Sequence, residues 1–336
     1  MFKGKKILIT GGTGSLGRAL TERLLKLDVD TIRIFSRNEN KQVTMESEIP
    51  DDRLRFFIGD VRDYNRLTKA LEDIDIVFHA AALKHVPVVE YNPFEAIKTN
   101  IIGSQNLINA CLNEDVEIAV GVGTDKAVSP LNTYGATKLL MEKLFVTAQN
   151  YTNTERHRTK FISLRYGNVL GSSGSVVPKF INQIKSKQKI TITHPDMTRF
   201  SITMEEALDF ILNSTINGKG SEIFVPKLKA YSILDVRDAL KELLGDFEEE
   251  VTSIRPGEKM HEVLINEDEI RSTWEEDSKY AILNTSFVNK DKIKSQYPKM
   301  KQVELFSQYS SDLAEKIRKS ELKELIKNSG LLNEKE

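Results

Sequence analysis

A tyrosine, a lysine and an acid–base pair lie close together near the middle of the chain. Tyr134 and Lys138 are four residues apart, so on a helix they share one face. A tyrosine pKa is ordinarily about 10, and a neighbouring ammonium lowers it. We therefore expect Tyr134 and Lys138 to remove a proton from an alcohol or sugar hydroxyl during an oxidation, with Thr124 orienting that hydroxyl.

Asp125 and Lys126 supply two further proton-transfer groups that a plain oxidation does not need. Oxidation of a sugar hydroxyl to a ketone acidifies the neighbouring C–H bond. Lys126, if its neighbours lower its pKa, would remove that proton, and Asp125 would protonate a β-hydroxyl as it leaves as water. The hydride stored on a nicotinamide would then return to the new double bond, so the net reaction predicted is a dehydration. A surface ion pair beside an unrelated helix is the alternative interpretation.

Alternating strands and helices would position these groups. Strands are predicted at residues 6–10, 31–35, 54–58, 75–79, 117–122 and 161–166, and helices at 16–27, 64–71, 96–112 and 134–148. This alternation predicts an α/β fold, a Rossmann-type doubly wound parallel sheet with helices on both faces. In such a sheet the carboxyl ends of the strands carry the site, where Thr124 is expected.

The pattern changes after about residue 170. Helices are predicted at 177–187, 204–217 and 235–244, strands at 190–193 and 222–225, and the charged tail has helical spacing at 311–325. We therefore predict a dinucleotide-binding Rossmann domain over 1–170. Residues 171–336 are predicted to form mainly a smaller α/β substrate-binding lobe with C-terminal helices, interleaved with the end of the sheet.

A glycine-rich turn follows the first strand and opens a helix. The glycines permit a tight turn and a close approach of the backbone to a pyrophosphate, and the helix N-terminus supplies N–H donors. The alternative is a merely tight turn. The ends of the third and fourth predicted strands are also expected to contact the dinucleotide. The predicted cofactor contacts are Gly11, Thr13, Gly14, Ser15, Leu16, Gly17, Asp60, Val61, Ala80, Ala81 and Ala82.

The end of the second predicted strand distinguishes NADP from NAD. Ser36 can hydrogen-bond a 2′-phosphate and Arg37 can pair with it. The alternative is that Arg37 is a surface residue and Glu39 binds the ribose 2′-hydroxyl of NAD. The pattern favours NADP.

Composition excludes several other classes of protein. Of 336 residues, 48 are Lys or Arg and 49 are Asp or Glu, so no basic excess indicates nucleic acid. The one cysteine, Cys111, is expected to be a buried thiol. The first apolar run is too short for a signal peptide or membrane span. We expect a cytoplasmic protein without a metal site, and His79 packed inside.

Several longer motifs resemble one family closely. The chain is similar, over roughly residues 5–265, to the inverting UDP-N-acetylglucosamine 4,6-dehydratases of the extended short-chain dehydrogenase/reductase family, which begin pseudaminic acid synthesis. The resemblance is carried by residues 80–87, 90–93, 98–100, 124–127, 134–138, 165–169, 197–200 and 255–259.

That resemblance implies roles for individual residues. It implies C-4 oxidation by Tyr134 with Lys138, Asp125 as the acid, Lys126 as the base at C-5, and reprotonation of C-5 from the opposite face, giving a 4-keto-6-deoxy-L-arabino product. It also implies a tightly bound, recycled NADP and a homo-oligomer, a dimer or hexamer. The implied substrate contacts are Lys84, Asn168, Val176, Arg199, Arg255 and Glu258, and the further cofactor contacts expected are Lys84, Asn100, Tyr134 and Lys138.

Three positions depart from the family pattern. Gly123 replaces the usual Ser, Ser173 replaces Arg, and Ser201 replaces Trp. A relative that performs only part of the reaction, forming a 5,6-ene sugar or converting it to the keto sugar, is therefore one alternative. A simple epimerase or reductase would not need Asp125 and Lys126. A non-catalytic NADP-binding sensor would be free to lose the catalytic residues, which are all present.

Overall fold

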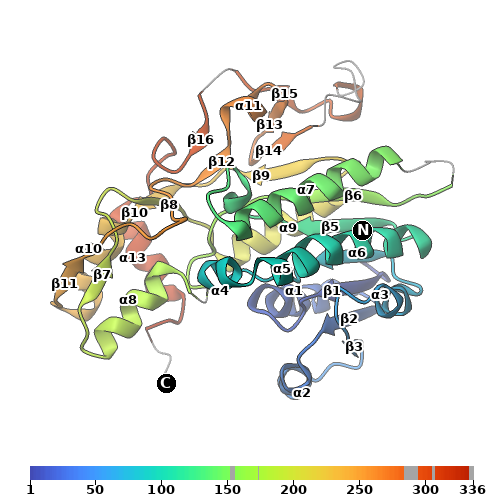
Figure 1. Ribbon diagram of the computed structural model, residues 1–336, viewed down its shortest axis with the longest axis horizontal. Helices are drawn as coiled ribbons and strands as arrows, with labels where there is room; N and C mark the ends of the chain where they lie inside the picture. Colours follow the sequence, from blue (N-terminus) through green and yellow to red (C-terminus); the bar gives the residue numbers. More distant parts are fainter. Residues whose placement is uncertain (152–155, 173, 284–293, 305–306, 333–336) are drawn as a thin grey trace.

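A computed structural model describes residues 1–151, 156–172, 174–283, 294–304 and 307–332. Its centre is a sheet in which seven strands run parallel in the order β3-β2-β1-β4-β5-β6-β9 (Figure 1). These strands are β1 Lys6–Thr10, β2 Thr31–Ser36, β3 Leu54–Ile58, β4 Ile76–His79, β5 Ile118–Val122, β6 Lys160–Leu164 and β9 Ile223–Pro226. The strand order reverses between β1 and β4, which is where such sheets bind ligands.

Helices cover both faces of this sheet. On one face α1 (Ser15–Leu25) packs with α9 (Met204–Asn217), where Ile7 and Ile9 of β1 are fully buried. On the other face α3 (Tyr64–Leu71), α6 (Gly103–Asn113) and α7 (Thr133–Tyr151) pack over Leu8. The predicted doubly wound α/β fold is therefore confirmed. One further helix, α2 (Glu39–Glu48), follows β2 and was not predicted.

Beyond β9 the sheet continues with antiparallel strands that the sequence did not indicate. The order is β9-β14-β13-β15, with β13 Thr273–Glu276, β14 Lys279–Ile282 and β15 Lys301–Gln302. The C-terminal part of the chain thus returns to the edge of the sheet.

A smaller lobe lies over the carboxyl ends of the strands, at the left of Figure 1. Val177, Phe180, Tyr231 and Val236 belong to a separate buried apolar core there. The elements of this lobe are α8 Val176–Lys185, β7 Ile190–Ile192, β8 Thr198–Phe200, β10 Ala230–Ser232, α10 Ile233–Leu244, β11 Glu249–Val251 and α13 Lys319–Asn328. β12 Val263–Ile265, α11 Glu267–Ile270 and β16 Tyr309–Ser310 pack instead near β9 and β14, in another apolar core. The division of the chain at residue 170 stays a prediction.

The helix predicted at 96–112 is divided in the structure. It consists of α5 (Pro93–Ala96), a π-helical segment η1 (Ile97–Ile102) and α6, and a short helix α4 (Val86–Tyr91) precedes it. π-helical turns are rare and often occur at functional sites. Here the segment buries Thr99 and Asn100.

The helix predicted at 311–325 was wrong in its first half. Helix α13 begins only at Lys319. Ser311 is fully buried, and its hydroxyl donates to the Thr198 carbonyl and accepts from the Glu262 backbone N–H. These tertiary hydrogen bonds hold the segment in an irregular path that its helical spacing did not reveal. A helix long and apolar enough to cross a bilayer does not occur in the described ranges.

Candidate active site

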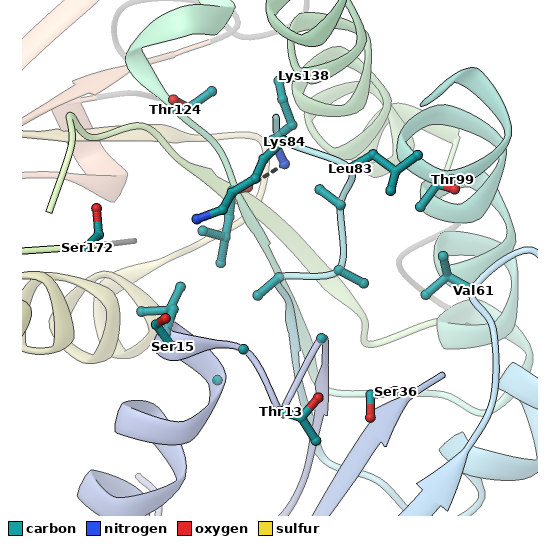
Figure 2. Close-up of a pocket in the computed structure, with 18 of the residues that line it drawn as sticks. Thr13, Ser15, Ser36, Val61, Leu83, Lys84, Thr99, Thr124, Lys138 and Ser172 are labelled. Carbon is teal, nitrogen blue, oxygen red and sulfur yellow. Dashed lines mark hydrogen bonds between the residues drawn. The ribbon is translucent and has the colours of Figure 1, made fainter. Parts of the chain in front are cut away.

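Two cavities meet at the carboxyl ends of the central strands. One has a volume of about 500 Å3 and extends along the ends of β1, β2 and β4, and the other, of about 390 Å3, lies beneath the smaller lobe. Figure 2 shows the first cavity, with Lys84 extending into the space between Thr124 and Ser15. The residues that line both cavities are Lys84, His85, Thr124, Tyr134, Asn168 and Ser172.

The first cavity contains almost all of the predicted cofactor contacts. Gly11 has a φ of +67°, and a Cβ there would lie 2.9 Å from the Ala81 backbone. Only glycine fits at this position of the turn, because any side chain would overlap the Ala81 backbone. Helix α1 starts after Gly14 with no side-chain cap, which leaves its first N–H groups directed toward the cavity. The predicted residues in the wall are Gly11, Thr13, Gly14, Ser15, Leu16, Gly17, Ser36, Arg37, Asp60, Val61, Ala80, Ala81, Ala82, Lys84, Tyr134 and Lys138.

The wall at the end of β2 is polar and basic. The Ser36 hydroxyl accepts a hydrogen bond from Gln42 at 3.0 Å, and the Arg37 guanidinium lies 3.7 Å from the Asp60 carboxylate. Lys41 also lines the cavity. Glu39, the acidic alternative, is exposed and is not part of this wall.

Asn100 is placed differently from the prediction, because it does not line the cavity. It is buried in the π-helical segment, where its side-chain oxygen accepts from the Leu83 N–H at 2.8 Å. Its amide nitrogen donates to the Leu83 carbonyl and to the Thr137 hydroxyl. Asn100 thus connects the loop after β4, which borders the cavity, to helix α7.

The predicted catalytic side chains lie together between the two cavities. Lys126 donates to the Asp125 carboxylate at 3.1 Å and to the Asn168 amide oxygen at 2.9 Å. The Thr124 hydroxyl donates to the same Asp125 oxygen at 2.9 Å. Asp125 is 1% exposed and lies behind this group, and its second carboxylate oxygen has no partner in the structure.

The charge on Lys126 differs from the expectation. Burial lowers the pKa of Lys126, but the carboxylates of Asp125 and Glu262 outweigh burial and hold that pKa above its ordinary value. The condition named for Lys126 as a base, a pKa lowered by its neighbours, is therefore not met by this arrangement of charges. Asp125 and Lys126 form an ion pair in the structure.

Tyr134 and Lys138 lie on α7 at the wall of the first cavity. Burial raises the pKa of Tyr134, while Lys126 and a hydrogen bond with Thr124 act to lower it. The lowering expected from Lys138 is not what the structure gives, because the Lys138 ammonium donates to the Val122 carbonyl at 2.6 Å (Figure 2). Burial also lowers the pKa of Lys138 to about 8, although Glu142 opposes this change.

The second cavity contains every predicted substrate contact. Lys84, Asn168, Val176, Arg199, Arg255 and Glu258 all line it. Arg199 is 7% exposed and lies 3.5 Å from Glu258 and 3.7 Å from Glu262. Lys84, Lys126, Lys179, Arg199, Arg255 and Lys259 make the described wall strongly cationic, with two carboxylates, Glu258 and Glu262.

Sequence reasoning missed several residues of this cavity. Lys259 donates to the Val128 carbonyl, and Asn132 donates to the Gly257 carbonyl at 2.9 Å. These two bonds attach the segment that carries Arg255 and Glu258 to the segment between Lys126 and α7. The motif at 255–259 indicated the region, but only the fold shows what it contacts. Glu262, three residues beyond that motif and 4% exposed, had no sequence signal.

Two of the three departures from the family pattern lie within the described residues. A Cβ on Gly123 would lie 2.3 Å from the Leu164 carbonyl oxygen, so β5 and β6 approach too closely there for a larger residue. Ser201 is buried after β8, where its N–H donates to the Lys229 carbonyl. Ser173 lies outside the described residues. His79 and Cys111 are buried, as predicted, and burial lowers the His79 pKa to about 3.

The described residues contain no group of three or more His, Cys, Asp or Glu side chains suited to hold a metal ion.

The fold and the paired cavities define a doubly wound protein with a nucleotide-type cavity beside a cationic one. Comparison with known proteins supplies the family. The chain belongs to the polysaccharide biosynthesis protein family, whose profile matches residues 7–284.

Individual relatives are more specific. A Campylobacter jejuni protein named UDP-N-acetylglucosamine 4,6-dehydratase (inverting) is 47% identical over 294 residues, 87% of this chain and 86% of that protein. The resemblance to the inverting dehydratases is thereby confirmed. A Rickettsia felis protein named UDP-glucose 4-epimerase is 39% identical over 99% of this chain and 98% of its own length. The crystal structure of Pen from Bacillus thuringiensis, 39% identical, superposes with a TM-score of 0.89 over 99% of both chains.

Proposed function

We propose that this protein is an NADP-dependent dehydratase that acts on UDP-N-acetylglucosamine. The reaction would comprise oxidation at C-4, loss of water across C-5 and C-6, hydride return to C-6 and inversion at C-5. The product would be UDP-2-acetamido-2,6-dideoxy-L-arabino-hex-4-ulose, a precursor for pseudaminic acid. The observation that carries this proposal is the Asp125–Lys126 pair, joined at 3.1 Å beside Tyr134 where the two cavities meet.

The first cavity fits a nicotinamide dinucleotide. The close approach of Gly11 to Ala81 and the uncapped start of α1 suit a pyrophosphate. Ser36, Arg37 and Lys41 in the wall favour the 2′-phosphate of NADP, while Glu39 is turned out of it. A nicotinamide held by these residues would supply reversible hydride transfer, with no net change in its oxidation state over a turnover.

The chain's own residues supply the proton transfers. Tyr134, assisted by Thr124 and Lys138, would take the proton of the C-4 hydroxyl. Lys126 donates to Asp125 as an ion pair, whereas elimination would need a neutral amine at C-5 and a protonated acid near the C-6 hydroxyl. Movement of one proton along their hydrogen bond produces both forms at once. Thus the ion pair is one tautomer of the proposed acid–base centre.

The second cavity suits the nucleotide-diphosphate part of the substrate. Arg199 and Arg255 would bind its phosphates, because a guanidinium group forms bidentate hydrogen bonds with phosphate oxygens. Lys84 reaches the region that both cavities share and would contact both ligands. Asn168, Val176 and Glu258 complete the proposed substrate contacts.

A partial reaction that stops at the 5,6-ene sugar is the second candidate function. Gly123 favours it, because the serine usual at this position would overlap the Leu164 carbonyl and is excluded from this backbone. A different backbone at the end of β5 would place Thr124 differently, and this could stop the reaction at an earlier step.

Incubation with UDP-N-acetylglucosamine, without added reductant and followed by NMR, tests both candidates. The dehydratase gives the 4-keto-6-deoxy-L-arabino sugar and no net NADPH. A 5,6-ene product supports the partial reaction, a C-4 epimer assigns the epimerase activity instead, and unchanged substrate rejects the proposal. Comparing NADP and NAD affinities tests the cofactor: tighter binding of NAD would contradict the assignment of Ser36 and Arg37.

We further propose that the protein works in the reducing cytoplasm, as its single cysteine suggests, and as a homo-oligomer, a dimer or hexamer. Tyr91 and Phe94, on α4 and α5, are 88% and 75% exposed, and Val88 and Leu140 add exposed apolar surface on α4 and α7. A second copy covering these side chains would remove them from water. Light scattering after size exclusion tests this, since a Tyr91→Glu, Phe94→Glu double variant should be smaller than the wild type.

A further inference from the structure

Glu262 is a buried carboxylate that bridges the two parts of the site. One of its oxygens lies 3.8 Å from the Lys126 ammonium and 3.7 Å from the Arg199 guanidinium. Its other oxygen is buried and has no hydrogen-bond partner among the described residues. A buried charge is costly unless it is paired, so a carboxylate held here needs its two cations.

The backbone around Glu262 fixes its position. Its N–H donates to the Ser311 hydroxyl at 2.9 Å, and its carbonyl accepts from the Ser311 N–H at 2.8 Å. The Ser311 hydroxyl also bonds to the Thr198 carbonyl, next to Arg199. Glu262 and Arg199 are thus held against one another by the same C-terminal residue.

The Lys126 amine has two direct hydrogen-bond acceptors, Asp125 and Asn168, and Glu262 lies beyond hydrogen-bond distance as a third negative neighbour. Burial favours loss of the proton from an ammonium, whereas nearby carboxylates favour its retention. The charged or titratable groups around Lys126 come from several elements: Asp125 of its own segment, Tyr134 of α7, Tyr231 of β10, and Lys259 and Glu262 before β12.

We propose that Glu262 is a positioning residue of the acid–base centre, which keeps the Lys126 amine charged and fixed between Asp125 and Asn168 until proton transfer to Asp125 begins. This inference rests on the proposed function for its catalytic consequence. Glu262 reaches the reacting atoms only through Lys126. It also lies between that lysine and Arg199, the proposed phosphate contact. A change at Arg199 therefore alters the charge around the Lys126 amine.

Competitive labelling with acetic anhydride, read by mass spectrometry over a pH series, measures the apparent pKa of the Lys126 amine without any turnover. In Glu262→Gln that pKa should fall by about one unit or more. Glu258→Gln is the matched control, because Glu258 also pairs with Arg199 and, within the described part of the chain, also has an unpartnered buried oxygen but forms no ion pair with Lys126. In this control the Lys126 labelling curve should match that of the wild type.

Glu262→Asp retains the charge on a shorter side chain and should give an intermediate shift, and it also serves if Glu262→Gln does not fold. The acidic limb of kcat/KM for UDP-N-acetylglucosamine should move to lower pH in the same order. Labelling curves that coincide for wild type and Glu262→Gln would overturn the inference, as would equal shifts in both Gln variants. A labelling shift in a protein that leaves UDP-N-acetylglucosamine unchanged would reject the proposed function and leave the control of Lys126 by Glu262 supported.

Discussion

At the scale of single residues, the proposed reaction requires Lys126 to lose its proton before water is eliminated. We expect Lys126→Met to lower the rate of water elimination about a hundred-fold or more, which is typical for removal of a general base. Tyr134 and Lys138 remain, so C-4 oxidation should still occur and reduced nicotinamide should accumulate. NMR in deuterated water checks this, since deuterium still entering C-5 at the wild-type rate would assign the base to another group.

Gly123 is the residue at which the backbone excludes the family's usual serine. We expect Gly123→Ser to destabilise the protein by about 1–3 kcal/mol, as overpacking in a buried strand does, and to lower kcat because Thr124 is displaced. The overlap begins at Cβ, 2.3 Å from the Leu164 carbonyl, so Gly123→Ala should be affected similarly. Urea unfolding and product analysis measure both effects, and a serine variant as stable as the wild type would refute the steric argument.

Residue types and spacing could predict which side chains gather at the site, because β5 and β6 end at one edge of the sheet and α7 begins beside it. Thr124, Tyr134 and Asn168 lie there as expected. The full set of charges that raise the pKa of Lys126 could not be predicted, because Glu262, which adds to the effect of Asp125, reaches Lys126 only through the fold of the C-terminal half.

At the scale of elements, prediction worked where a segment's own pattern decides its structure. Strands such as β1 and β3 and helices such as α3 and α9 have the bounds that their apolar spacing indicated. The π-helical segment could not be predicted, because it is arranged around tertiary hydrogen bonds of Asn100. The residues before α13 follow a non-helical path for the same kind of reason, the bonds of Ser311.

The π-helical segment is predicted to support cofactor binding, because Asn100 holds the loop after β4. Asn100→Ala leaves the Leu83 N–H and carbonyl without their buried partner, and each unpaired group costs about 1–3 kcal/mol. We expect a lower melting temperature and about tenfold weaker NADP binding, because the loop after β4 loosens. Asn217→Ala is a control away from the cofactor cavity, since Asn217 at the end of α9 donates only to the Asn213 carbonyl among the described residues. Unchanged NADP affinity in Asn100→Ala would show that the loop does not need this support.

At the scale of the whole molecule, buried charges join the sheet to the C-terminal part. Arg165, fully buried at the end of β6, pairs with Glu142 of α7 and with Glu269 of α11 at 2.8 Å. It also donates to the Leu264 carbonyl of β12. The helix that carries Tyr134 and Lys138 is therefore tied to the region that carries Glu262. The ion pairs and the hydrogen bond of Arg165 thus position both Tyr134 and Glu262 at the proposed active site.

Glu222, before β9, makes the stability of this assembly depend on pH. Burial raises the pKa of Glu222 from its ordinary value of 4.5 to about 7, although backbone N–H groups of Lys219 and Gly220 oppose the change. The Tyr297 hydroxyl of the C-terminal part donates to the same carboxyl group. The folded protein therefore holds a proton on Glu222 between about pH 4.5 and 7, where the unfolded chain has released it.

The contribution of Glu222 to the free energy of unfolding is then fully present below about pH 4.5 and is lost as the pH rises through 7. A shift of this size corresponds to about 3 kcal/mol over the whole range. Glu222→Gln cannot ionise, so its stability should fall less than that of the wild type between pH 5 and about pH 7.5. Urea midpoints at the two pH values measure the difference. Parallel losses in the two proteins would show that Glu222 does not carry the pH dependence and that its proton is not retained in the folded state.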